Sequence, residues 1–132
     1  MSGADSKRVV RTFMDLFEHA AVDDALAMMT DDATWEVVGK PHLYAGAGVH
    51  SKAEMARSWP ELFAKLDGGL RMRVTGLIAE GDQVSAEIRS DAITRTGKRY
   101  ENDYHFLIAV RDGRIARVKE YTDLMHAAEI LG

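Results

Sequence analysis

The sequence contains no cysteine among its 132 residues, so neither a disulfide framework nor thiolate chemistry is available to it. The absence of cysteine also fits a reducing compartment, and we expect a cytoplasmic protein. No segment approaches the roughly 20 consecutive apolar residues of a transmembrane helix. No apolar run follows the first charged residues, as it would in a signal peptide. These absences predict a chain with no membrane partner.

The sequence also has no excess of basic residues over acidic ones. The 17 Lys and Arg residues are outnumbered by 21 Asp and Glu residues, which gives a net charge of -4 with no basic stripe. Because nucleic-acid binding relies on clustered positive charge, we expect no nucleic-acid partner. Internal repeats and low-complexity segments are absent too. The length therefore predicts one domain over residues 1–132.

The first half of the sequence has the apolar spacing of helices. The spacing predicts one helix over residues 5–20 and a short second helix over 24–29. Ser51 and Glu54 have the separation of a capping box, which predicts that a third helix opens there. Pro60 lies within this third pattern, and we expect it to kink or restart the helix.

The second half of the sequence alternates with the period of strands. A strand over 33–38 and a loop over 39–48 come first, and the period changes to two after Gly69. The four later strands are expected over 70–80, 83–96, 99–111 and 114–122. The last two meet at Asp112-Gly113, a strong signal for a tight hairpin. A helical half followed by an antiparallel meander predicts an α+β fold with helices packed on one sheet face.

Arg89 and Asp91 occupy one face of the strand predicted over 83–96, because residues two apart on a strand point the same way. The opposite face of that strand is apolar, and this favours a solvent-exposed ion pair. The next strand has a partly apolar pattern on both faces, so the parity leaves a second interpretation open. In that interpretation, the two charged residues face a pocket, where charge is costly unless it has a function.

Three short motifs carry a family resemblance: Thr30-Asp-Asp-Ala-Thr-Trp-Glu36, Tyr44-Ala-Gly46, and Asp112-Gly-Arg-Ile followed by Lys119-Glu-Tyr-Thr-Asp123. With these motifs the chain resembles the nuclear-transport-factor-2-like superfamily, and within it the SnoaL-like and ketosteroid-isomerase-related proteins. The resemblance covers nearly the whole chain. It implies a cone-shaped fold, in which about three N-terminal helices pack on a curved, mainly antiparallel sheet around an apolar pocket. It also implies a homodimer through the sheet.

The resemblance can be tested against the catalytic set of ketosteroid isomerase. Carried onto this sequence, the general base of that family falls on Val37 and its oxyanion tyrosine on Phe13. Valine cannot carry a proton, and phenylalanine cannot donate a hydrogen bond. Steroid isomerisation by that set of residues is therefore disfavoured.

The limonene epoxide hydrolase branch of the superfamily offers a different match. Its Arg-x-Asp pair is similar to Arg89-Ser-Asp91, and its acid on the last strand is similar to Glu120. A cation between two acids can hold one ionised and the other protonated, which suits epoxide opening. The water-positioning residues of that family would fall on Trp35 and Val37, and neither is a good substitute. Epoxide hydrolysis is therefore an alternative function.

The leading hypothesis is an enzyme that performs cofactor-free acid/base chemistry, by isomerisation, cyclisation or hydration, on a hydrophobic small molecule. In SnoaL-like cyclases such a site needs an acid/base residue in an apolar cavity. Here Asp91 or Glu120 would be the base, and Arg89 would stabilise an enolate. We expect these three side chains to converge in the pocket. The predicted substrate-binding residues are Trp35, Trp59, Asn102, Tyr104 and Thr122.

No metal site is expected, because His42, His50 and His126 are scattered without the close spacing of ligands. His105 should face away from Asn102 and lie at the surface or at an interface. The alternative from another functional class is a non-catalytic ligand-binding or dimerisation module. That alternative predicts an outward-facing Arg89–Asp91 pair and a pocket lined only by apolar groups.

Overall fold

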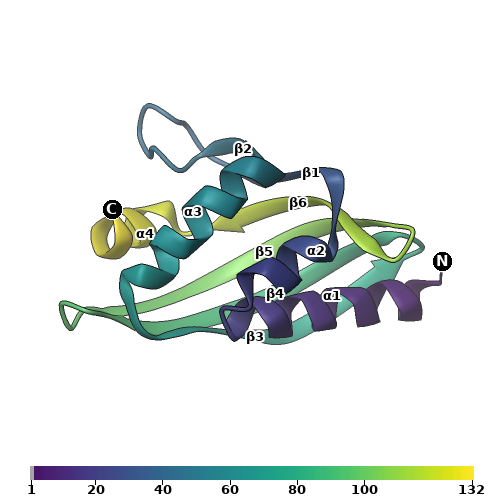
Figure 1. Cartoon of the computed structure of the whole chain (residues 1–132), viewed down its shortest axis with the longest axis horizontal. Coiled ribbons are helices and arrows are strands. Elements are labelled where there is room, and N and C mark those ends of the chain that lie inside the picture. The colour runs from purple at the N-terminus through teal and green to yellow at the C-terminus, as the bar shows by residue number, and fades with distance from the viewer. Residues whose placement is uncertain (1) are drawn as a thin grey trace.

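The computed structural model describes residues 2–132, which form a layer of helices against one curved sheet (Figure 1). The helices are α1 (Gly3–Glu18), α2 (Val22–Ala27), α3 (Lys52–Ala64) and α4 (Leu124–Leu131). The strands are β1 (Met29–Val37), β2 (Gly48–Ser51), β3 (Leu66–Glu80), β4 (Gln83–Thr94), β5 (Arg99–Arg111) and β6 (Arg114–Thr122).

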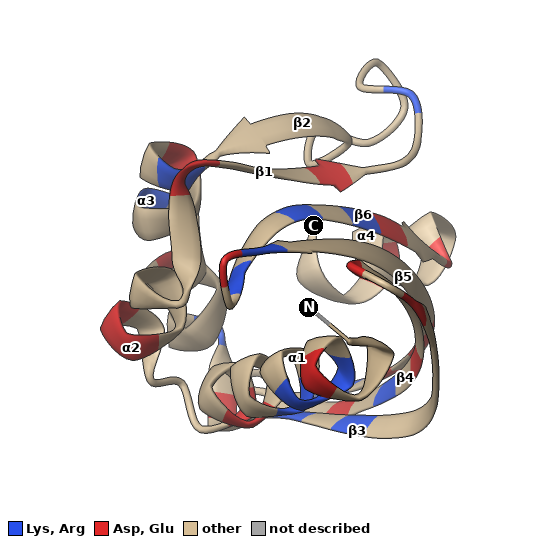
Figure 2. Cartoon of the chain, turned by 90° about the vertical axis from the view of Figure 1, so that its right-hand side faces the viewer, with Lys and Arg blue, Asp and Glu red and all other residues tan. Residues whose placement is uncertain are grey.

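The strands form one six-stranded sheet in the order β2-β1-β6-β5-β4-β3. All neighbours are antiparallel except β1 and β6, which run parallel. Figure 2 shows the sheet curling around α1 without closing into a barrel, with charged residues of both signs on several of its strands. The predicted α+β fold, with helices on a curved and mainly antiparallel sheet, is confirmed.

The core lies between the helices and the concave face of the sheet. Alternate residues of β4 point into it, and Val84, Ala86 and Ile88 are almost completely buried. Phe13 of α1 and Phe106 of β5 are fully buried in the same cluster. Burial of these apolar side chains is the main force that holds the helices on the sheet.

The structure tests three local predictions from the sequence: the capping box, the hairpin turn and the break at Pro60. Ser51 Oγ accepts a hydrogen bond from the Glu54 backbone N–H at 3.2 Å, and both halves of the capping box are present. The hairpin at Asp112-Gly113 is confirmed, because these residues have φ values of 52° and 77°, as its tight turn requires. The expected restart at Pro60 is wrong, since α3 runs through it. Pro60 and Ala56 both lie at the exposed surface, where water can satisfy the carbonyl that loses its helical donor.

Two elements of the structure fall outside the expected set. Strand β2 begins at Gly48, where the expected loop ends, and pairs with β1. Helix α4 follows β6, and the Asp123 side chain caps it by accepting from the backbone N–H groups of Met125 and His126. None of the helices described over residues 2–132 is long and apolar enough to cross a membrane.

Candidate active site

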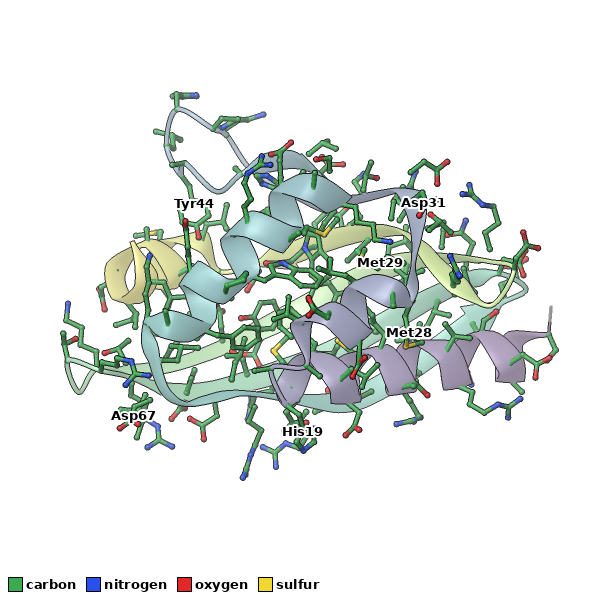
Figure 3. All side chains as sticks on the ribbon, in the orientation of Figure 1. His19, Met28, Met29, Asp31, Tyr44 and Asp67 are labelled. Atoms are coloured by element: carbon green, nitrogen blue, oxygen red, sulfur yellow. The ribbon has the colours of Figure 1, made fainter. Side chains whose placement is uncertain are left out.

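A cavity opens between α3, α4 and the concave face of the sheet. Its outer compartment has a volume of about 510 Å³, and a smaller inner compartment has about 140 Å³. The two compartments share wall residues, so they are adjacent. The shared wall residues are Phe17, Trp35, Val37, Tyr44, Gly46, Leu62 and Glu120. Figure 3 shows that Tyr44 lies on the loop between β1 and β2, beside α3.

Glu120 is the ionisable group at the junction of the two compartments. It lies on β6 opposite Val37 of β1, and the Trp35 indole Nε1–H donates to its Oε1 at 2.8 Å. Burial raises the pKa of Glu120 to about 7, while the Trp35 hydrogen bond and the nearby His50 imidazole act in the opposite direction. A carboxyl group with this pKa can both accept and release a proton near neutral pH.

Two tyrosines of β5 line the inner compartment. The hydroxyl oxygens of Tyr100 and Tyr104 are 2.6 Å apart, and Asn102 Nδ2 donates to the Tyr100 oxygen at 3.0 Å. Burial raises the pKa of both phenols above the ordinary value, and the charge of Glu120 acts in the same direction. Both hydroxyls therefore remain neutral near pH 7 and can act as hydrogen-bond donors.

The mouth of the cavity is polar, in contrast to its aromatic interior. His50 contacts the Gly46 carbonyl through Nε2 at 2.7 Å and the Glu54 carboxylate through Nδ1 at 3.2 Å. Glu61 and Arg57 belong to the same rim. An apolar interior with a few placed polar groups is typical of a site for a small hydrophobic ligand.

The expected convergence of Arg89, Asp91 and Glu120 is wrong. Arg89 and Asp91 lie on the outer face of the sheet, where Arg89 Nε donates to Asp103 Oδ1 at 3.0 Å and Arg99 Nη2 donates to Asp91 Oδ2 at 3.2 Å. The Arg89 side chain is 58% exposed. The physical reason is strand parity: the apolar residues of β4 fill the core, so the residues between them must point outward.

The predicted substrate-binding residues lie in or beside the cavity, and their binding roles stay predictions. Trp35 and Trp59 line the outer compartment, while Tyr104 and Thr122 line the inner one. Asn102 is buried behind this wall. Its amide contacts the Tyr100 hydroxyl, the Asp123 carbonyl and the Asp103 backbone N–H.

Some residues of the cavity were not predicted from the sequence as site residues. Tyr100 has the same strand parity as Asn102 and Tyr104, so its inward direction was readable from the sequence. Tyr44 comes from the loop between β1 and β2, and His50 comes from the four-residue strand β2, which is too short for a periodicity that indicates which side chains face inward. Within residues 2–132, no cluster of three potential metal ligands is found.

The comparisons with known proteins agree with this geometry at the level of the fold. The profile of the SnoaL-like domain matches residues 10–118. The chain belongs to the SnoaL-like family. A comparison with curated protein sequences finds no match.

Solved structures place this SnoaL-like chain in the nuclear-transport-factor-2-like fold. A structure of TerC co-crystallised with polyporic acid is 19% identical, with a TM-score of 0.81 over 96% of this chain and 98% of that one. An NTF2-like protein from Burkholderia xenovorans is 20% identical, with a TM-score of 0.76 over 100% and 99%. An LEH-like epoxide hydrolase from M. tuberculosis is 20% identical, with a TM-score of 0.78 over 96% and 89%. At these identities, the likeness shows the shared fold.

Proposed function

We propose that this SnoaL-like protein is an enzyme that moves protons on a small hydrophobic molecule, with Glu120 as its acid/base residue. The proposal covers isomerisation, cyclisation or hydration, and it needs no cofactor for the proton transfer. The observation that carries it is an acid with a pKa of about 7 in a cavity whose inner walls are largely aromatic and aliphatic. A matching protein co-crystallised with polyporic acid, and another that is an epoxide hydrolase, support a small-molecule enzyme.

The proposed mechanism follows from the contacts of Glu120. The Trp35 N–H holds Oε1, so Oε2 is the oxygen left for the substrate among the contacts of the described residues. In its ionised form, the carboxylate takes a proton from a substrate carbon. In its protonated form, it returns that proton to the same or another atom. The aromatic walls exclude water, which strengthens electrostatic interactions during the transfer.

The geometry weakens both alternatives. Epoxide hydrolysis was predicted from an arginine and a second acid beside Glu120, but Arg89 and Asp91 lie on the outer face. A non-catalytic binding module predicts that outward-facing pair, and to this extent it agrees with the structure. It also predicts a cavity lined only by apolar groups, which differs from a cavity that holds Glu120 and tyrosine hydroxyls.

The elimination of 5-nitrobenzisoxazole tests the proposal, because its ring opens when a base removes one C–H proton. We expect the wild-type protein to accelerate this reaction with a pH–rate inflection near 7. Glu120→Gln should lower the rate by about 100-fold, in line with the usual contribution of general base catalysis. Glu61→Gln is the matched control, because Glu61 is an exposed acid at the mouth. Equal rates for wild type and Glu120→Gln would refute the assignment.

A further inference from the structure

Helix α4 is attached to β5 through a histidine side chain. Strand β6 pairs with β5 only from Tyr104 to Arg111, so the stretch of β5 before Tyr104 extends beyond its partner strand. In that stretch the backbone N–H of Glu101 donates to Nε2 of His126 at 3.2 Å. The His126 ring also stacks on Tyr100, with ring centroids 5.3 Å apart and an angle of 4° between the planes. One imidazole therefore supplies both a hydrogen bond and an aromatic contact between the helix and the sheet.

The hydrogen bond from Glu101 requires one protonation state of the His126 ring. A backbone N–H can only donate, so Nε2 must offer its lone pair. A neutral imidazole with its hydrogen on Nδ1 can do this, whereas an imidazolium carries hydrogens on both nitrogens and has no acceptor. When the ring takes up a second proton, two N–H groups face each other and the bond to Glu101 is lost. The bond is therefore present at high pH and is lost as the pH falls.

The other titratable groups on the two elements that meet at this ring have contacts of their own or are exposed. The Glu101 carboxylate is paired with Arg99, and the Asp123 carboxylate accepts from backbone N–H groups at the start of α4. Glu129, further along α4, is exposed. The Tyr100 ring can keep its stack on an imidazolium, because a cation is attracted to the face of an aromatic ring. Protonation therefore removes the hydrogen bond and leaves the stack.

Helix α4 has few other polar attachments to the rest of the chain. Among the described residues, Asn102 Nδ2 donates to the Asp123 carbonyl at 3.1 Å, and Lys65 Nζ donates to the Leu131 carbonyl at 3.0 Å. These two bonds lie at the two ends of the helix, and His126 supplies the bond from its first turn. The loss of one bond among so few should favour local opening of the helix.

We propose that His126 is a pH-dependent latch on the cavity. The neutral ring holds α4 on β5, and the protonated ring loosens the helix. Leu124, Ala127 and Leu131 of α4 form part of the wall of the inner compartment, so loosening the helix opens that compartment to solvent. The inference concerns access to the cavity, and it holds whether or not Glu120 is the acid/base residue.

Hydrogen exchange tests the latch when it is expressed as protection relative to an unstructured peptide, because this ratio removes the direct effect of pH on exchange. We expect the protection of α4 amides to fall roughly three- to tenfold as the pH is lowered through the titration of the His126 ring, which NMR follows in the same samples. Protection in α1 should not fall. Glu120→Gln should show the same loss in α4, which separates the latch from the cavity acid. Constant α4 protection across the His126 titration would overturn the inference.

Two variants of His126 separate the effect of the proton from that of the ring. Glutamine offers a side-chain oxygen near the position of Nε2 and does not titrate, so His126→Gln should keep α4 protected at low and high pH. Phenylalanine keeps a ring against Tyr100 without an acceptor, so His126→Phe should lower α4 protection at every pH. His42→Gln is the matched control, because His42 is exposed on the loop between β1 and β2, and it should keep the wild-type pH dependence. A wild-type pH dependence in His126→Gln, or full α4 protection in His126→Phe, would overturn the latch.

Discussion

Glu120 links the stability of the fold to pH. Burial raises its pKa from the ordinary 4.5 to about 7, so between these values the folded state holds a proton that the unfolded state has lost. The free energy of unfolding should therefore fall as pH rises through this window. Glu120→Gln removes this dependence, and at pH 8 it should be roughly 2–3 kcal/mol more stable than the wild type. Urea unfolding from pH 4 to pH 9 measures the difference.

The control for this experiment is Glu54→Gln. The hydrogen bond from His50 lowers the pKa of Glu54, so its contribution to stability has the opposite sign and is lost as pH falls. Glutamine can still serve the capping box of α3, which limits structural side effects. If both glutamine variants changed the pH dependence in the same direction, the role given to Glu120 would be wrong.

The hydrogen bond from Trp35 lowers the pKa of Glu120. Burial is the largest influence on the pKa of Glu120, and the Trp35 hydrogen bond opposes it by favouring the ionised form. Trp35→Phe keeps an aromatic wall but removes the N–H donor, so the pKa of Glu120 should rise further. Infrared titration of ¹³C-labelled carboxyl groups measures this shift. Trp59→Phe is the matched control, because Trp59 lines the cavity without a hydrogen bond to Glu120 among the contacts found, and it should leave the pKa in place.

At the scale of elements, α4 closes the inner end of the cavity, and its N-cap is a single side chain. Leu124, Ala127 and Leu131 line the inner compartment, and Asp123 accepts from the first backbone N–H groups of the helix. Asp123→Ala should cost about 1 kcal/mol and fray this helix. Hydrogen exchange should then accelerate in α4 and remain unchanged in α1. Glu129→Ala, an exposed change on the same helix, is the control; equal acceleration in both variants would contradict the capping role.

Elements with strong local chemistry were predictable from the sequence. The Ser51–Glu54 spacing and the Asp112-Gly113 turn each specify a backbone geometry through neighbouring residues alone, and both occur in the structure. Strand β2 has only four residues and begins at Gly48 with a φ of 112°, so it leaves no readable period. Helix α4 did leave a signal, because Asp123 precedes apolar residues at helical spacing, although the family motif was expected to end there.

Site prediction failed where a family pattern was preferred over strand parity. The apolar alternation of β4 indicated that Arg89 and Asp91 face solvent, and the structure agrees with this simpler interpretation. For Glu120, sequence parity was less informative, since the β5–β6 register shifts between Ala109 and Val110. A bulge of this kind reverses the facing of every later residue on the strand. The register of β6 therefore had to come from the structure.

At the scale of the whole molecule, the outer sheet face carries exposed apolar side chains that a single chain leaves uncovered. Ile78 is 74% exposed and stands opposite Ser85, which in turn stands opposite the partly buried Leu107. Tyr121 is 40% exposed on the same face, beside His105. Exposed apolar patches of this kind often mark interfaces, so we propose that two chains pair through this face as a homodimer.

Replacing an exposed apolar residue of this face with lysine tests whether the face is the dimer interface. Ile78→Lys places a charge among these exposed apolar side chains on the edge strand β3, where burial against a partner would be costly, so it should shift the protein to the monomer in sedimentation velocity experiments. Ile93→Lys is the matched control: Ile93 is 46% exposed on the same outer face, but it lies at the far end of β4 beside Arg99. The control should remain dimeric. A wild-type protein that sediments as a monomer up to about 100 µM, far above the Kd of a stable dimer, would contradict the proposed pairing.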